Sequence, residues 1–209
     1  MYFNIKSKET SACRNSIGGY PVLPNGTAWP KCEASGSNMV MFLQFDVPEI
    51  VGLGKGYHLT IFMSPEINEI PCFNLVANGK PLPEGFEANF EKHFKAYLFK
   101  GGQQLEEEDQ YLVSYSLELS KNSSQNCFKV GGAPEWLQDA ELPIGPKGEE
   151  FKFIAQIPEG HGFPKKTSAP EQPDSFSAND YCLFLGNQIY IFGSSELEKE
   201  QAIWVAVQG

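Results

Sequence analysis

Arginine is almost absent from this sequence of 209 residues, because Arg14 is the only one among its 16 basic residues. Bidentate recognition of phosphate groups and base edges depends on the guanidinium fork of arginine. Positive charge is scarce as well, since 26 acidic residues give the chain a formal net charge of -10 at pH 7. A field of this sign repels phosphate backbones and anionic lipid headgroups. The sequence therefore disfavours nucleic-acid and membrane partners, and it permits a basic protein or a cationic ligand.

Long apolar runs and closely spaced cysteines are also missing. No apolar run approaches the roughly 18 residues that span a bilayer. The N-terminal residues MYFNIKSKET contain no apolar region of a secretory signal. The five cysteines are odd in number and widely spaced, which excludes CxxC metal and redox motifs. These features predict a protein that functions in the reducing cytoplasm.

Three pairs of similar segments recur in the same order in the two halves of the chain, which indicates an internal duplication. The members of the first pair, IGGYPVLPNGTAWP and VGGAPEWLQDAELP, share a Gly-Gly turn and two prolines at the same spacing. In the second pair a glutamine lies inside a short apolar segment, and in the third a glycine leads into Ile-Phe. The pairs are residues 17–30 and 130–143, 41–45 and 153–157, and 56–66 and 186–196.

Most segments of the chain predict β-strands, because short runs rich in Phe, Ile, Val and Tyr lie between turn-forming residues. The alternation over residues 111–119 predicts a half-buried strand. Residues 84–100 differ, since large apolar side chains recur there at helical spacing and predict an amphipathic helix packed on the sheet. These side chains are Phe86, Phe90, Phe94, Tyr97 and Leu98. We therefore expect an α+β fold of predominantly antiparallel strands, forming a single domain over residues 1–209 with intertwined repeats at about 16–104 and 105–209.

Catalytic motifs are lacking: the chain contains no GxSxG, P-loop, GxGxxG or HExxH sequence. Of the three histidines, His58 lies in an apolar strand and His93 lies between phenylalanines, so that only His161 is flanked by a polar loop. Cys32 follows a lysine that could lower its pKa, although a small buried thiol is the interpretation we favour. The sequence predicts a non-enzymatic protein with no catalytic residue, metal site or cofactor.

Two glutamines, Gln44 and Gln156, occupy equivalent places inside apolar strands, where an amide is costly unless it is hydrogen-bonded. In one interpretation each amide caps or bridges a backbone edge near the Pro-Glu turn that follows its strand. In the alternative, both line a cleft between the repeats together with His161. That cleft would make the chain a small-molecule binding protein or a weak hydrolase.

The acidic excess lies entirely in the second half of the chain. Residues 1–104 contain nine basic and nine acidic residues, whereas residues 105–209 contain seven and 17. Acidic runs are often only a solvated face that protects a sheet edge. The first repeat has no such excess, which favours a charge-steered interface for a basic protein. The predicted partner-binding residues are Glu106, Glu107, Glu108, Asp109, Glu149 and Glu150, with Trp136 and Phe163 as aromatic anchors.

Several of these motifs together resemble the YwqG-like family of bacterial proteins. They are the Gly-Gly-x-Pro-x-Leu-Pro stretch leading to Trp-Pro, the FLQF segment followed by Pro-Glu, the strand GYHLTIFMS and the later GGAPEWLQ. The resemblance spans most of residues 16–205 except residues 72–128, and it carries over no catalytic residue. It implies a duplicated, β-rich α+β fold in the bacterial cytoplasm. Some relatives lie in polymorphic-toxin gene clusters, which implies an immunity protein that binds a cognate toxin.

Overall fold

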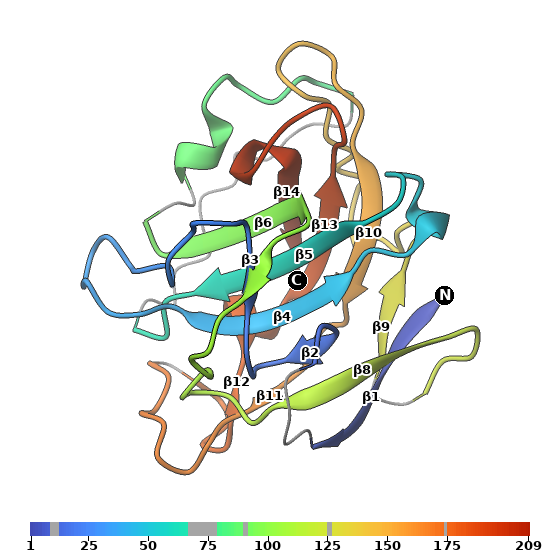
Figure 1. Cartoon of the computed structure of the whole chain (residues 1–209). Coiled ribbons are helices and arrows are strands. Elements are labelled where there is room, and N and C mark those ends of the chain that lie inside the picture. Colours follow the sequence, from blue (N-terminus) through green and yellow to red (C-terminus); the bar gives the residue numbers. More distant parts are fainter. Residues whose placement is uncertain (9–12, 67–78, 90–91, 125–126, 174) are drawn as a thin grey trace.

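A computed structural model describes residues 1–8, 13–66, 79–89, 92–124, 127–173 and 175–209. Its main element is a ten-stranded sheet in which neighbouring strands run antiparallel (Figure 1). In spatial order the strands are β14 (Ile203–Gln208), β13 (Gln188–Gly193), β10 (Lys152–Ile157), β9 (Cys127–Val130), β1 (Tyr2–Lys8), β8 (Tyr115–Ser120), β2 (Ser16–Ile17), β4 (Val40–Asp46), β5 (Tyr57–Met63) and β6 (Phe94–Lys100).

Smaller elements pack against this sheet. Two short antiparallel ladders pair β3 (Val22–Leu23) with β7 (Gln103–Gln104), and β11 (Phe163–Pro164) with β12 (Asp180–Tyr181). The described 3₁₀ turns are η1 (Glu49–Val51), η2 (Phe86–Asn89), η3 (Leu183–Gly186) and η4 (Glu200–Ala202).

The large sheet curls until its two edge strands, β6 and β14, approach each other (Figure 1). Leu98 of β6 forms an isolated bridge with Lys199, which lies shortly before β14. The main hydrophobic core includes Phe3 and Phe45, whose ring centroids are 4.7 Å apart. Curling lets one sheet bury a continuous apolar face on itself without a covering layer of helices.

A second hydrophobic core lies beneath the β3–β7 ladder, on the outer face of β4, β5 and β6. It contains Val22, Leu23, Met41, Phe62, Tyr97 and Phe99, all of which are buried. Phe94, Ala96 and Leu98 of the same strand β6 belong instead to the main core. Strands β4 to β6 are therefore buried on both faces and show little alternation of apolar and polar residues.

The predicted helix over residues 84–100, and with it the α+β fold class, is wrong. Residues 86–89 form the short turn η2, residues 90–91 lie outside the described residues, and β6 begins at Phe94. Because both faces of β6 are buried, its apolar residues follow one another closely and imitate a helical stripe. The described part of the chain is nearly all antiparallel β, with 39% of its residues in strands and 7% in helical turns. Among the described residues, no helix is long and apolar enough to cross a membrane.

The two halves of the sheet have the same strand order on either side of the central β1–β8 pair. One half runs β8-β2-β4-β5-β6 and the other runs β1-β9-β10-β13-β14, so each half borrows its innermost strand from the other part of the chain. Both Gly-Gly turns have positive φ angles, which are 58° and 90° at Gly18 and Gly19 and 65° and 76° at Gly131 and Gly132. This is the arrangement that a duplicated unit with exchanged strands would produce. The strand expected over residues 111–119 begins only at Tyr115.

Candidate functional site

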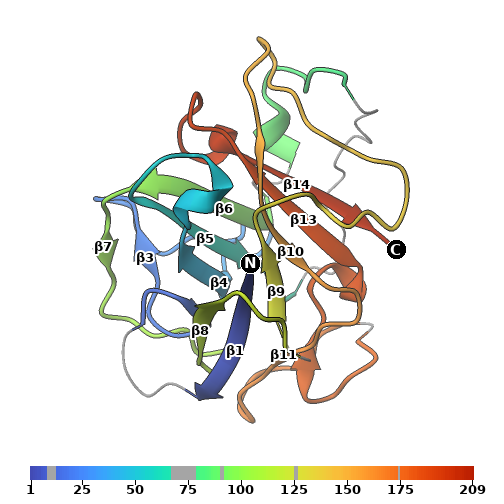
Figure 2. The same ribbon diagram turned by 90° about the vertical axis from the view of Figure 1, so that its right-hand side faces the viewer.

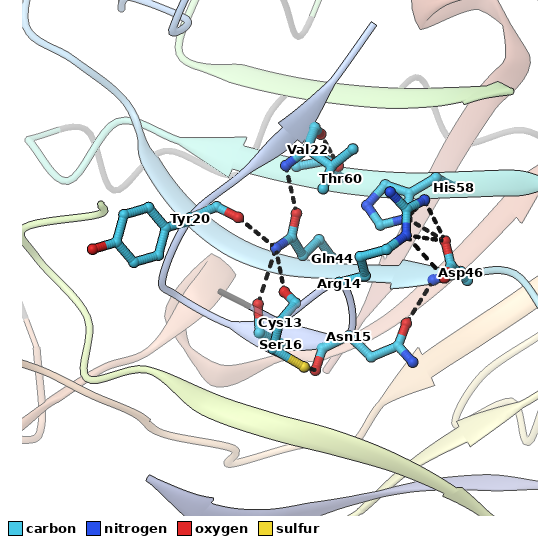
Figure 3. A network of polar contacts seen from close by, with 10 residues as sticks. All are labelled: Cys13, Arg14, Asn15, Ser16, Tyr20, Val22, Gln44, Asp46, His58 and Thr60. Atoms are coloured by element: carbon cyan, nitrogen blue, oxygen red, sulfur yellow. Dashed lines mark hydrogen bonds and ion pairs between the residues drawn. The ribbon is translucent and has the colours of Figure 1, made fainter. Parts of the chain in front are cut away.

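Gln44 lies at the centre of a polar network on the outer face of β4 (Figure 3). Its side chain is fully buried, and its Oε1 accepts a hydrogen bond of 2.8 Å from the backbone N–H of Val22. Its Nε2 donates to the carbonyls of Tyr20 and Cys13 and lies 3.1 Å from the Ser16 hydroxyl. The amide therefore joins strand β4 to the segments at residues 13–16 and 20–22, and both of its N–H groups are occupied.

Gln156 makes the corresponding bond in the second half of the sheet. Its Oε1 accepts from the backbone N–H of Glu135 at 2.9 Å. In each half a hydroxyl of the neighbouring strand binds the carbonyl of the same loop residue. Thr60 donates to the carbonyl of Val22, and Tyr190 donates to the carbonyl of Glu135. Each glutamine thus attaches a loop to the outer face of the sheet, as a structural role requires, but the loop is the segment after the Gly-Gly turn and not the Pro-Glu turn.

A second polar group joins the segment after β1 to the strands β4 and β5 (Figure 3). Asp46 accepts two bonds from Arg14, 2.7 Å from Nη2 and 3.1 Å from Nε, and its Oδ1 lies 2.9 Å from Nδ1 of His58. Asn15 accepts a bond from the backbone N–H of Asp46 at 2.8 Å. The bond to His58, followed by the bond to Arg14, holds the pKa of Asp46 well below its usual range, whereas burial lowers the pKa of His58.

This Asp–His pair has the orientation of a general base, but its position argues against catalysis. His58 is 0% exposed, its ring contacts Phe99 edge-on at 5.5 Å, and its Nε2 has no partner among the described residues. A substrate cannot reach Nε2 without opening the outer core. We interpret Arg14, Asp46 and His58 as a structural link, and the only sequence signal for it is the single arginine.

His161, the third residue of the alternative pocket, packs edge-on between the rings of Phe128 and Phe163 at 4.9 and 4.7 Å. Phe163 is itself 0% exposed and also contacts Phe42, so it belongs to the core and is wrong as a surface anchor. None of Gln44, Gln156 and His161 lines either of the two hollows described below. The structure gives these three residues separate packing roles.

The burial of His161 leads to a pH prediction. Burial lowers its pKa from 6.5 to about 4, against the opposing charge of Asp180. The unfolded chain takes up this proton below pH 6.5 while the folded chain resists it, so stability is lost as the pH falls from 6.5 to about 4. The loss from this residue should reach about 3 kcal/mol. Urea unfolding of the parent and of His161→Phe at pH 7.5, 5.5 and 4.5 measures it, and equal pH slopes would contradict the assignment.

The acidic run at residues 106–109 divides into exposed and buried members. Glu106 and Glu107 are exposed, whereas Glu108 lies 3.4 Å from the Lys166 ammonium. Asp109 is only 2% exposed and accepts three backbone N–H bonds, one from the neighbouring strand and two from its own turn. Burial raises the pKa of Asp109 in spite of these bonds. Asp109 is therefore a structural residue, and its prediction as an interface residue is wrong.

A hollow of about 320 Å³ lies beside this run. Its walls combine carboxylates, aromatic rings and prolines, among them Trp29, Pro65, Glu107, Glu108, Tyr111 and Pro170. Trp29 is held in place because its Nε1 donates to the carbonyl of Met39 at 2.7 Å and its ring contacts Phe62 edge-on. In the sequence Trp29 appears only in the Trp-Pro motif at the end of the first Gly-Gly stretch, and nothing there predicts that it lies beside the acidic run.

The other predicted acidic pair lies elsewhere. Glu149 lines a separate hollow of about 280 Å³ with Glu84 and Glu87, and the two hollows have no lining residue in common. The Glu149 carboxylate also accepts a bond from the backbone of Lys147, and Glu150 pairs with Lys152. Trp136 packs on Tyr190 and Phe192 on the outer face of β13. The structure thus distributes the predicted interface over three places.

The described part of the chain holds no group of three or more His, Cys, Asp or Glu side chains that could bind a metal ion. No protein-family model matches the chain, and no curated protein matches it significantly.

Proposed function

We propose that this protein is a non-enzymatic binding protein that engages a basic partner through the hollow beside residues 106–108. The observation that supports the proposal is the combination in one hollow of the carboxylates of Glu107 and Glu108 with the fixed ring of Trp29. A lysine or arginine side chain suits such a site, because its charge meets a carboxylate while its stem packs on an aromatic face.

Electrostatics supports the same partner class. Glu106 and Glu107 have no ion pair within the described ranges, so their charges remain available to a partner. The net charge of -10 would steer a cationic protein toward this surface and speed its association at low salt. A tryptophan held by its neighbours can act as the central anchor of an interface.

The partner that we propose is a cognate bacterial toxin, so that the protein acts as an immunity protein in the cytoplasm. Toxins that attack nucleic acids or nucleotides need cationic clefts, because their substrates carry phosphates. An acidic protein that occupies the cleft blocks the substrate. The resemblance to YwqG-like proteins supports this proposal, and co-expression with the adjacent toxin gene tests it: absence of both protection and a complex would refute it.

Charge reversal at Glu107, which lines the hollow, and at the preceding Glu106 should weaken the complex with that toxin. The double variant Glu106→Lys/Glu107→Lys is expected to reduce affinity at least about tenfold and to make it less dependent on salt. Isothermal titration calorimetry at two salt concentrations measures both effects. The matched control is Glu196→Lys/Glu198→Lys, which changes the net charge equally at exposed positions outside the hollow. Equal losses in the two variants would show that net charge, rather than this hollow, determines binding.

A further inference from the structure

The two halves of the sheet differ in how their outer faces are covered. In the first half, β3 is held on the sheet by Gln44, and its other edge pairs with β7 in the register Val22↔Gln104 and Leu23↔Gln103. The pairing continues with a bond of 2.9 Å from the N–H of Leu105 to the carbonyl of Pro21. The chain reaches this place directly from β6 through two glycines. At Gly102 a Cβ atom would lie 2.6 Å from the Leu23 carbonyl oxygen.

In the second half, residues 134–138 occupy the place of β3, because Gln156 holds Glu135 as Gln44 holds Val22. Their outer edge has no strand beside it in the part of the chain that the structure describes. Within the same ranges the backbone of Trp136, the counterpart of Leu23, forms no hydrogen bond. This edge offers the groups that β3 uses to pair with β7.

The surroundings of this edge are apolar and acidic. Leu137, which follows Trp136, is 50% exposed, and Leu142, further along the same segment, is 43% exposed. Residues 133–142 contain three acidic residues and no lysine or arginine. Figure 2 shows this segment, which follows β9, on the opposite side of the molecule from β3 and β7. A second copy of the chain would bring like charges together here, which disfavours self-pairing.

We propose that the outer edge of residues 134–138 binds an extended segment of the basic partner as an added β-strand, in the place that β7 takes in the first half. Backbone bonds to Trp136 supply the pairing, and an apolar side chain of the segment packs on Leu137 and Leu142. Flanking lysines or arginines meet Asp139 and Glu141. The basic identity of the segment rests on the proposed function, whereas the strand-accepting edge rests on the comparison of the two halves.

Whether this edge accepts a strand can be tested without the partner. The end of β14 lies beside the edge, so a segment added after Gly209 can reach it. Gln138 donates to the carbonyl of Gly209 at 2.8 Å, and the register places Gly209 where Lys100 ends β6. We expect that a copy of residues 101–105, Gly-Gly-Gln-Gln-Leu, added after Gly209 will pair with the edge and slow amide exchange at Trp136 at least about tenfold. The control extension carries proline at its third and fifth positions, the counterparts of Gln103 and Leu105, which removes the N–H groups that face the edge and should give no protection.

A peptide added in trans tests the charge of the occupant. A synthetic Lys-Lys-Gln-Gln-Leu-Lys-Lys peptide should shift the amide resonances of residues 134–142 in a salt-sensitive manner, and its counterpart with glutamate for lysine should not. The variant Leu137→Asp, at a half-exposed position, should weaken binding of the lysine peptide.

Each outcome bears on a separate part of the proposal. Equal amide exchange rates at Trp136 with and without the Gly-Gly-Gln-Gln-Leu extension would refute the proposal that this edge accepts a strand. If the lysine and glutamate peptides bound equally well, or if neither bound, the proposal that the bound segment is basic would be refuted. None of these results depends on the toxin or on Glu106 and Glu107, so failure here is distinguishable from failure of the proposed function.

Discussion

Replacing Gln44 by methionine should lower the free energy of unfolding by about 3 to 5 kcal/mol, the largest stability effect that we expect of any single substitution proposed for this protein. Methionine preserves the length and volume of the side chain but can replace none of its hydrogen bonds. It would leave the buried N–H of Val22 and the part-buried carbonyl of Cys13 without a partner, and the Tyr20 carbonyl with only the 3.3 Å bond from Gln104. Unpaired buried polar groups carry their full cost of desolvation. Urea unfolding followed by tryptophan fluorescence measures the change.

Gln156 supplies the matched control. Gln156→Met removes the bond to the N–H of Glu135, at a position that is 6% exposed, and should cost only about 1 to 2 kcal/mol. The two substitutions are chemically identical and fall at equivalent places in the two halves. Equal losses of unfolding free energy in the two variants would show that the larger number of hydrogen bonds made by Gln44 does not determine its contribution to stability.

Substitution of Asp109 by asparagine should cost about 2 to 4 kcal/mol, because an amide cannot accept all three backbone bonds. Oδ1 accepts from Tyr111 and Leu112, and Oδ2 accepts from the N–H of Met41 on strand β4. In asparagine an NH₂ group replaces one of these oxygens and faces a donor. The loss should appear as a lower urea midpoint with an unchanged slope.

Glu106→Gln provides the comparison for Asp109→Asn. It removes an equal charge three residues away, but Glu106 is exposed and should change stability by less than about 0.5 kcal/mol. Similar losses in the two variants would mean that net charge, and not the bonds of Asp109, accounts for the effect. The comparison also separates the structural member of the acidic run from the members proposed to contact a partner.

Local sequence patterns were most informative about strands and turns. The apolar segments at 41–45 and 153–157 lie in β4 and β10, and those at 56–66 and 186–196 contain β5 and β13. The expected dominance of antiparallel strands is confirmed. Glycine pairs indicated turns because positive φ angles favour glycine whatever the distant contacts are. The sequence also predicts that Gln44 needs hydrogen-bond partners, since an amide inside an apolar strand is costly otherwise.

The same patterns failed where burial depended on distant segments. Residues 94–100 have an apolar spacing compatible with either a helix or a strand covered on both faces. The cover over Tyr97 and Phe99 comes from β3 and from residues 29–39, which no local pattern reveals. Asp109 likewise resembles its acidic neighbours in sequence, and only the approach of β4 turns it into a buried acceptor. The sequence is compatible with Phe163 as a surface anchor or as a core residue. Its contact with Phe42 shows that it belongs to the core.

Composition and local spacing thus established the acidic character of the chain, the excess of charge in its second half, and its strand-forming, turn-rich segments. These properties follow from the residues themselves and from their near neighbours along the chain. Whether residues 94–100 form a helix, which carboxylates remain exposed, and the association of Trp29 with Glu107 and Glu108 were decided by tertiary packing. The physical reason is that burial and hydrogen bonding at these places are supplied by segments tens of residues away.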